Sequence, residues 1–254
     1  SVTASGGGIH VWKNSNPTIQ RCRIANNQCT NYGGGILFDA ASMTSQGTIL
    51  DCEFSNNQAV YGGGIAFIAN GQVSLSRCII RGNMSTTGGG LYATGAGARP
   101  TLTSCLIVVN YASGEGGGLR SNMAYPNLVN CTLAGNVADS GSGAFRSDSY
   151  APTLSNCILW SNTPTANVGP ATITYSDVQG GYAGTGNINS DPLFGNALYG
   201  EYHLLAGSPC FNTGNNAATG IPAQDLDGKS RILGGIVDLG AYESGPRILH
   251  VPQQ

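Results

Sequence analysis

The stretch GGGIAFIANGQVSLSRCIIRGN, residues 62–83, contains the pattern that decides the fold. Three glycines precede a short apolar run, a second run leads to Cys78, and a third leads to Asn83. Nearly the same phrase recurs along the chain, with cysteines at intervals of 26 to 30 residues and an asparagine five residues after each of them. A fixed internal period of this length indicates a repeat architecture.

The repeat keeps its register through six copies. Apolar residues stand three positions before and two positions after each cysteine, and a glycine cluster usually ends seven or eight residues after the asparagine. The cysteines of the repeat are Cys22, Cys52, Cys78, Cys105, Cys131 and Cys157. The asparagines are Asn27, Asn57, Asn83, Asn110, Asn136 and Asn162. Each copy thus holds three short β-type runs between turn residues, without a helical period.

A unit of this size cannot bury its own apolar face, but copies stacked at a strand spacing of about 4.8 Å can. We therefore predict an all-β fold, a right-handed parallel β-helix of about eight or nine coils with a C-terminal cap. Glycine suits a tight corner because it tolerates positive φ. Asparagine stacks its amide on that of the next coil, and cysteine fills the core as a small apolar side chain.

The pattern also predicts the organisation of the chain. Regular coils are expected over residues 1–185, with Ser176 at the cysteine position of the last one. Residues 186–244 lose the repeat, and we expect them to form the last irregular coils and a cap, because an open coil exposes core and unpaired backbone. Residues 245–254 are expected to be an extension or a linker to a following unit.

Composition limits the classes of partner. Only 9% of the residues are charged and the formal net charge is −2, so no basic stripe is available for nucleic acid. No apolar run reaches the roughly 18 residues of a membrane helix, so we expect no membrane insertion. Because the cysteines supply one thiol per coil and no CxxC pair, we expect no metal and no other cofactor.

The cysteine ladder itself is expected to consist of buried free thiols. In-register parallel strands hold neighbouring Cβ atoms about 4.8 Å apart, whereas a disulfide favours about 3.8 Å. Two other groupings are interpreted as structural. The segment from Asp225 to Arg231 resembles a calcium loop, but Ile236 stands where the bidentate glutamate is needed. The histidines His10, His203 and His250 are scattered along the sequence.

One charged group could bind a ligand. Arg120 and Arg146 occupy the same repeat position, Asp148 lies on the same strand face as Arg146, and Glu115 stands near the corner before Arg120. With Tyr125 and Tyr150 as stacking residues, this patch could receive an acidic sugar. The alternative is a solvated ion-pair patch without a ligand.

Several further phrases carry a resemblance to a known family: NPTIQRCRIANN, TYSDVQGG, GTGNINSDPLF, YHLLAGSPC and DLDGKSR followed by VDLGAYE. Together they resemble secreted bacterial β-helix proteins of the choice-of-anchor Q domain type, and they are similar to polymorphic outer-membrane protein repeats. The resemblance implies an extracellular or cell-surface location and no single activity. Other β-helices are polysaccharide lyases or hydrolases, but their clustered catalytic residues have no match here, so no catalytic residue is assigned.

The ends of the sequence suggest a partner. RILHVPQQ, residues 247–254, resembles the start of a β-helix unit, and SVTASGGGIH at residues 1–10 lies inside a repeat. The chain could be one unit of a tandem array. Alternatively, the tail could pair with the open first coil of the next molecule, and such a head-to-tail contact gives a filament. We therefore expect the partner to be a further copy or an adjacent β-helix unit, with polysaccharide as a second candidate.

Three functions follow in order of preference. The first is a structural secreted or cell-surface scaffold that assembles head to tail. The second is a carbohydrate-active or carbohydrate-binding protein, and if the chain is an enzyme at all we expect a polysaccharide lyase or glycoside hydrolase. The third, ice binding, needs a flat threonine ladder, and we predict that Thr48, Thr101, Thr132 and Thr153 do not share a register.

Overall fold

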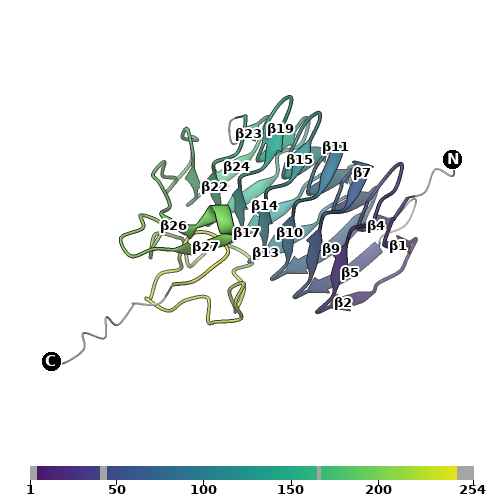
Figure 1. The fold of residues 1–254 in the computed structure, drawn as a ribbon. Coiled ribbons are helices and arrows are strands. Elements are labelled where there is room, and N and C mark those ends of the chain that lie inside the picture. The colour runs from purple at the N-terminus through teal and green to yellow at the C-terminus, as the bar shows by residue number, and fades with distance from the viewer. Residues whose placement is uncertain (1–4, 41–44, 165–166, 245–254) are drawn as a thin grey trace.

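The structure is a computed structural model that describes residues 5–40, 45–164 and 167–244. The chain folds as a right-handed parallel β-helix whose coils stack along one axis (Figure 1). The expected tail at 245–254, with His250, lies outside the described residues. Within the described ranges, no helix is both long enough and apolar enough to span a bilayer.

Three seven-stranded parallel sheets form the walls of the β-helix. Sheet A contains β1 (Ile9–Trp12), β4 (Ile36–Asp39), β8 (Ile65–Ile68), β12 (Leu91–Thr94), β16 (Leu119–Asn122), β20 (Phe145–Ser147) and β23 (Asn167–Val168). Sheet B contains β2 (Thr18–Gln20), β5 (Ser45–Leu50), β9 (Gly71–Ser76), β13 (Thr101–Thr103), β17 (Asn127–Val129), β21 (Thr153–Ser155) and β24 (Thr172–Thr174). Sheet C contains β3 (Arg23–Ala25), β6 (Glu53–Ser55), β10 (Ile79–Arg81), β14 (Leu106–Val108), β18 (Thr132–Ala134), β22 (Ile158–Trp160) and β25 (Asp177–Val178).

A fourth, shorter sheet follows the asparagines and was not predicted. Sheet D contains β7 (Gln58–Tyr61), β11 (Met84–Thr87), β15 (Tyr111–Ala112) and β19 (Val137–Ala138). Its strands are two to four residues long, so they carry too little alternation to be recognised in the sequence. Each of them leads into the glycine corner that precedes the next strand of sheet A.

The glycine corners are explained by two separate requirements. Gly33 has a φ of +67°, which favours glycine because a Cβ is disfavoured there. At Gly34 an added Cβ would lie 2.4 Å from the carbonyl oxygen of Gly63 in the next coil. The backbones of successive coils therefore approach each other at this corner more closely than any larger residue would allow.

The interior consists of rows of like residues. Ile36, Ile65 and Leu91 pair in register and are fully buried, and the Phe38 and Phe67 rings stack at 5.8 Å. The free thiols of Cys52, Cys78, Cys105, Cys131 and Cys157 line this core and are buried, as expected. Cys22 is also a free thiol but is exposed, so the expectation of burial is wrong for the first coil, where no described coil covers it. The Sγ of Cys78 donates to the carbonyl oxygen of Ser76 at 3.3 Å.

The predicted asparagine ladder is confirmed. The backbone N and the side-chain Nδ2 of Asn83 both donate to Oδ1 of Asn110, each at 3.0 Å. The Nδ2 of Asn110 in turn donates to the carbonyl oxygen of Ile80 and to Oδ1 of Asn136. Each buried amide therefore satisfies both its own polar atoms and a backbone group of the preceding coil.

The number of coils differs from the prediction. Each of the three walls contains seven stacked strands, which is about six full turns from the first strand to the last and not eight or nine coils, because the chain after β25 leaves the walls. Residues 182–190 cover the end of the last coil, where Ile188 bridges to Asp177 and Tyr182 packs against the core. The C-terminal segment, which we define as residues 191–244, then folds back along the outside (Figure 1).

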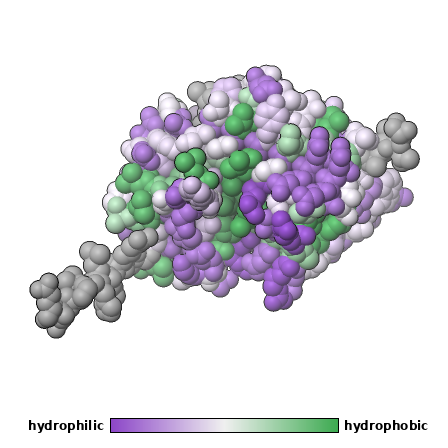
Figure 2. All heavy atoms as spheres, viewed as in Figure 1, coloured by the Kyte–Doolittle hydropathy of each residue, from purple (hydrophilic) through white to green (hydrophobic). Residues whose placement is uncertain are grey.

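The C-terminal segment lies against sheet C because the outer face of that sheet is apolar. Leu106, Val108 and Ala134 project outward from the coils and pack against Tyr202 and Tyr242 of the segment. The segment contains a short antiparallel pair, β26 (Phe194–Asn196) and β27 (Glu201–Leu204), joined by the 3₁₀ helix η1 (Ala197–Tyr199). On the face drawn in Figure 2, hydrophobic side chains reach the surface around this segment, whereas the coils expose mainly hydrophilic ones.

Candidate functional site

The charged patch predicted from the sequence lies on the outer face of sheet A. Arg120 of β16 and Arg146 of β20 are directly paired in register. The Nη2 of Arg120 contacts Oδ2 of Asp148 at 2.5 Å, and its Nε lies 3.3 Å from Oε2 of Glu115. The Nε of Arg146 lies 3.3 Å from Asp148 and 3.7 Å from Glu115. Two cations and two carboxylates therefore neutralise one another, which leaves little positive charge for an acidic sugar.

The two predicted tyrosines form a different contact. The rings of Tyr125 and Tyr150 stack with their centroids 4.5 Å apart. The guanidinium of Arg99 lies 4.3 Å from the centroid of the Tyr125 ring. Because Arg99 comes from the preceding coil and Tyr150 from the following one, both faces of Tyr125 are occupied. A sugar ring cannot stack on them without displacing a neighbour.

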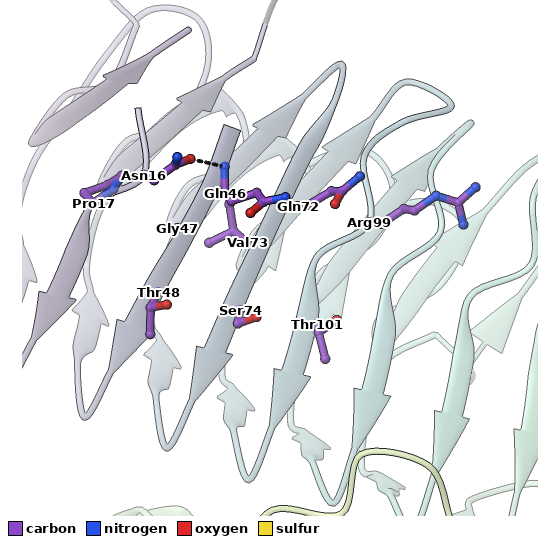
Figure 3. Close-up of a pocket in the computed structure, with 10 residues that line it drawn as sticks. All are labelled: Asn16, Pro17, Gln46, Gly47, Thr48, Gln72, Val73, Ser74, Arg99 and Thr101. Carbon is purple, nitrogen blue, oxygen red and sulfur yellow. Dashed lines mark hydrogen bonds between the residues drawn. The ribbon is translucent and has the colours of Figure 1, made fainter. Parts of the chain in front are cut away.

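A groove of about 510 Å³ runs along the outer face of sheet B (Figure 3). It is lined by Asn16, Pro17, Gln46, Gly47, Thr48, Gln72, Val73, Ser74, Arg99 and Thr101. Figure 3 shows Gln46, Gln72 and Arg99 in one row, with Thr48, Ser74 and Thr101 in a second row beside it. The Oδ1 of Asn16 accepts a hydrogen bond of 2.8 Å from the backbone N of Gln46. This groove was not predicted.

The second row of the groove corrects the analysis of the threonines. Thr48, Thr101 and Thr153 do share a register, so the opposite prediction is wrong for these three residues. The complete row across sheet B is Thr18, Thr48, Ser74, Thr101, Asn127, Thr153 and Thr172. Each member stands four residues before its cysteine, or before Ser176, and this spacing could have revealed the row.

The shared register of these three threonines does little to support ice binding. Thr132 departs from the row, because it lies buried on sheet C, where its Oγ1 accepts a hydrogen bond from Ala241. The remaining row is flanked by the long side chains of Gln46, Gln72 and Arg99. These side chains make the face a groove and not the flat surface that an ice crystal would require.

The loop that resembled a calcium site is a structural element of the C-terminal segment. Arg231 is only 1% exposed and donates to the carbonyl oxygens of Ala241 at 2.9 Å and Tyr242 at 2.8 Å. Its Nη2 lies 3.2 Å from Oε2 of Glu243. Asp225 accepts hydrogen bonds from the backbone N of Lys229 and Glu243. The described residues contain no group of three or more histidine, cysteine or acidic side chains placed to hold a metal ion.

His203 has partners that the sequence did not indicate. Its Nε2 lies 2.9 Å from Oδ2 of Asp227, and its Nδ1 contacts Oε1 of Glu201. Burial alone would lower the pKa of His203, but hydrogen bonds to the two carboxylates outweigh it and raise the pKa. Because Lys229 also contacts Asp227 at 2.7 Å, the group ties β27 to the loop that follows Asp225. Asp227 stands 24 residues away from His203, which explains why spacing did not connect them.

The comparisons with known proteins agree with this fold. A family model described as a right-handed beta helix region matches residues 1–107 of the chain. The match ends within β14, so it includes the coils that form the groove on sheet B. No curated protein and no solved structure matches the chain.

Proposed function

We propose that the chain is a structural scaffold of a secreted or cell-surface protein, and that further β-helical coils extend it end to end. Support comes from the N-terminal edge. Among the described residues, β1, β2 and β3 each have a partner strand on one side only. An open strand edge presents a row of backbone donors and acceptors, and an additional strand can pair with that row.

The direction of the asparagine ladder carries the proposal. Each Oδ1 along the ladder accepts two hydrogen bonds from the asparagine of the preceding coil. Asn27 donates from N and Nδ2 to Oδ1 of Asn57, both at 3.0 Å, but no described residue donates to its own Oδ1. A strand paired with this edge would bring donors to this oxygen, from a backbone N–H or from a side-chain amide.

The core at this edge is also incompletely covered. Ile9 and Ile19 are partly exposed, whereas Ile36 and Ile49, their partners in the next coil, are fully buried. Burying an apolar side chain contributes about 1.5–3 kcal/mol, so an added coil would gain stabilisation from these positions. At the opposite end, residues 182–190 already cover the last coil, so we propose the tail at 245–254 as the donor of the added strand.

The experiment is to measure molar mass by light scattering over a range of protein concentrations, together with electron microscopy. The chain is expected to form linear oligomers, and both Ile9→Lys and removal of residues 245–254 are expected to disperse them. Leu198→Lys is the matched control, because Leu198 is 95% exposed on η1, away from the edge. Monomers at every concentration, or oligomers that persist in Ile9→Lys, would contradict assembly through this edge.

A catalytic role in carbohydrate chemistry receives less support. The arginines that would have received an acidic sugar are paired with Glu115 and Asp148. A lyase or hydrolase would need a general base or acid directed at an accessible substrate site. The groove on sheet B contains amides, hydroxyls and one guanidinium but no carboxylate or histidine among its lining residues. These groups are therefore better suited to binding a carbohydrate as a ligand than to reacting with it as a substrate.

A further inference from the structure

We propose that the groove on sheet B binds an extended acidic polysaccharide, with Arg99 as the residue that receives a carboxylate of the sugar chain (Figure 3). This binding site lies on a side wall of the β-helix, whereas the proposed assembly uses its N-terminal edge. The two proposals therefore rest on different residues.

The neutral lining groups suit sugar hydroxyls. Gln46 and Gln72 each offer an amide with two donors and an acceptor, and Thr48 and Ser74 each offer a hydroxyl. These four side chains are exposed, and they come from directly paired positions on β5 and β9. Equivalent groups therefore recur about every 4.8 Å along the axis, which matches a ligand that is itself a chain of repeating polar units.

The charge of the groove selects an acidic ligand. Among the described residues, Arg99 is the only charged one that lines the groove. Most other arginines of the coils pair with a carboxylate, as Arg77 does with Asp51 at 2.7 Å. Arg99 is exposed and makes no ion pair with a described carboxylate. Its planar guanidinium can therefore bind a sugar carboxylate through two parallel hydrogen bonds.

Arg99 is held in position before a ligand arrives. Its guanidinium lies 4.3 Å from the centroid of the Tyr125 ring, and Tyr150 supports Tyr125 from the other side. A cation over an aromatic face is attracted to it, which restricts the rotamers of a long side chain. Less conformational entropy is then lost on binding. The two tyrosines predicted as sugar-stacking residues would thus act indirectly, by positioning Arg99.

The shape of the groove fits a chain better than a single sugar. Its volume of about 510 Å³ lies within the usual range of ligand sites, about 300–1,000 Å³. The lining extends over four coils, from Asn16 to Thr101, which is about 14 Å at the strand spacing. A linear oligosaccharide lying parallel to the axis would meet both rows of side chains along this length.

The test is calorimetric titration of the full chain with an oligogalacturonate, a short polymer of sugar carboxylates, and with a neutral cello-oligosaccharide of equal length. We expect the oligogalacturonate to bind and the neutral sugar to bind at least about tenfold more weakly, because a charge-assisted hydrogen bond is lost. Arg99→Gln keeps hydrogen-bond donors but removes the charge, and it is expected to lower oligogalacturonate affinity about tenfold. Gln72→Ala is expected to have a smaller effect.

Arg23→Gln is the matched control. Arg23 is also exposed, but it lies on sheet C, outside the groove. Its substitution is therefore expected to leave the affinity for oligogalacturonate unchanged. Melting temperatures of all variants show whether each is folded. Absence of oligogalacturonate binding to the wild-type chain would overturn the proposal. Equal affinity of wild type and Arg99→Gln, or equal affinity for acidic and neutral sugars, would also overturn it.

Discussion

The regular coils and the C-terminal segment bury their polar groups in different ways. In the coils, most buried polar groups are neutral amides and hydroxyls, with Arg120 and Asp177 as exceptions, and charged pairs such as Arg77 with Asp51 lie on the outside. In the C-terminal segment, Arg231, Asp238 and Glu243 are almost completely buried. Neutral ladders can be repeated from coil to coil, whereas a buried charge needs a specific set of partners at one place.

The two regions also differ in how far apart in sequence their contacts are. Neighbouring coils repeat one contact about every 26 residues, as between Asn110 and Asn136. The C-terminal segment is fixed by unique contacts over longer separations: Asn130 donates to the carbonyl oxygen of Asp238 at 3.0 Å, 108 residues away. A substitution in one coil therefore removes one of several similar contacts, whereas a substitution in the C-terminal segment removes a contact that occurs once.

The largest expected effect is on the buried charges of the segment. Arg231→Met should lower the free energy of unfolding by about 3–5 kcal/mol, because it leaves the carboxylates of Glu243 and Asp238 buried without their cation. Urea denaturation measures the change. Arg23→Met is the control and should cost less than about 1 kcal/mol, since its ion pair with Glu53 is exposed and 3.8 Å long. Equal stability of the two variants would remove the distinction between the regions.

An intermediate effect is expected inside the ladder. Asn110→Ala should cost about 2–3 kcal/mol, because it leaves Asn83 and the carbonyl oxygen of Ile80 without buried partners. Asn27→Ala, at the partly exposed edge, should cost less, since nothing described donates to its Oδ1. Thermal unfolding of both variants measures this difference. If both variants lower the melting temperature equally, the asparagine at the N-terminal edge contributes as much as one inside the ladder, and the expected difference is wrong.

The smallest effect concerns the junction between the two regions, where β25 meets the C-terminal segment. Asp177 is fully buried, accepts hydrogen bonds from Ser190 N at 3.1 Å and Cys210 Sγ at 3.3 Å, and is destabilised in its charged form. Burial raises its pKa from the usual 3.8 to about 6. Between these two pH values the Asp177 carboxyl binds more protons in the folded state than in the unfolded state. Its contribution to the free energy of unfolding is therefore fully present below pH 3.8 and is lost as the pH rises through 6.

Asp177→Asn should remove this dependence. At pH 7 the variant is expected to be more stable than the wild type by about 1–2 kcal/mol, somewhat less than the full shift implies because Asn keeps only part of the hydrogen bonding. Near pH 3.8, where the folded-state carboxyl is protonated, this gain is absent and the variant should be less stable than the wild type, because Asn keeps only part of the hydrogen bonding. Denaturation curves at several pH values provide the comparison. A difference in stability that does not change with pH would show that the Asp177 carboxyl is not the titrating group.

Much of the fold could be predicted because the same short sequence pattern recurs many times in this chain. The glycine corners, the buried cysteine positions and the asparagine ladder each repeat with one spacing, so errors at single residues do not alter the inference. The groove was less accessible to sequence reasoning. Its row of Thr48, Ser74 and Thr101 does have a fixed spacing from the cysteines, but four-residue offsets of small polar residues carry no strong hydrophobic signal.

The charged groups show what spacing cannot decide. The proximity of Arg120, Arg146 and Asp148 followed from the repeat, but their mutual neutralisation depends on rotamers, which the sequence does not encode by period. His203 meets Asp227 because the loop after Asp225 turns back toward β27. Arg99 meets Tyr125 because neighbouring coils place the two side chains together. Neither contact follows from the spacing of the residues.

The sequence by itself determined that the chain stacks like residues on like residues in a parallel β-helix, because each repeat has an apolar face that only another repeat can cover. Only the tertiary structure decided where the winding stops. The outer face of sheet C, with Leu106 and Val108, can be kept from water only by the C-terminal segment, which therefore runs along the coils and adds no further turn to them. The tertiary structure also decided that Arg99 lies over the ring of Tyr125 and makes no ion pair with a described carboxylate, because that depends on which side chains meet across coils.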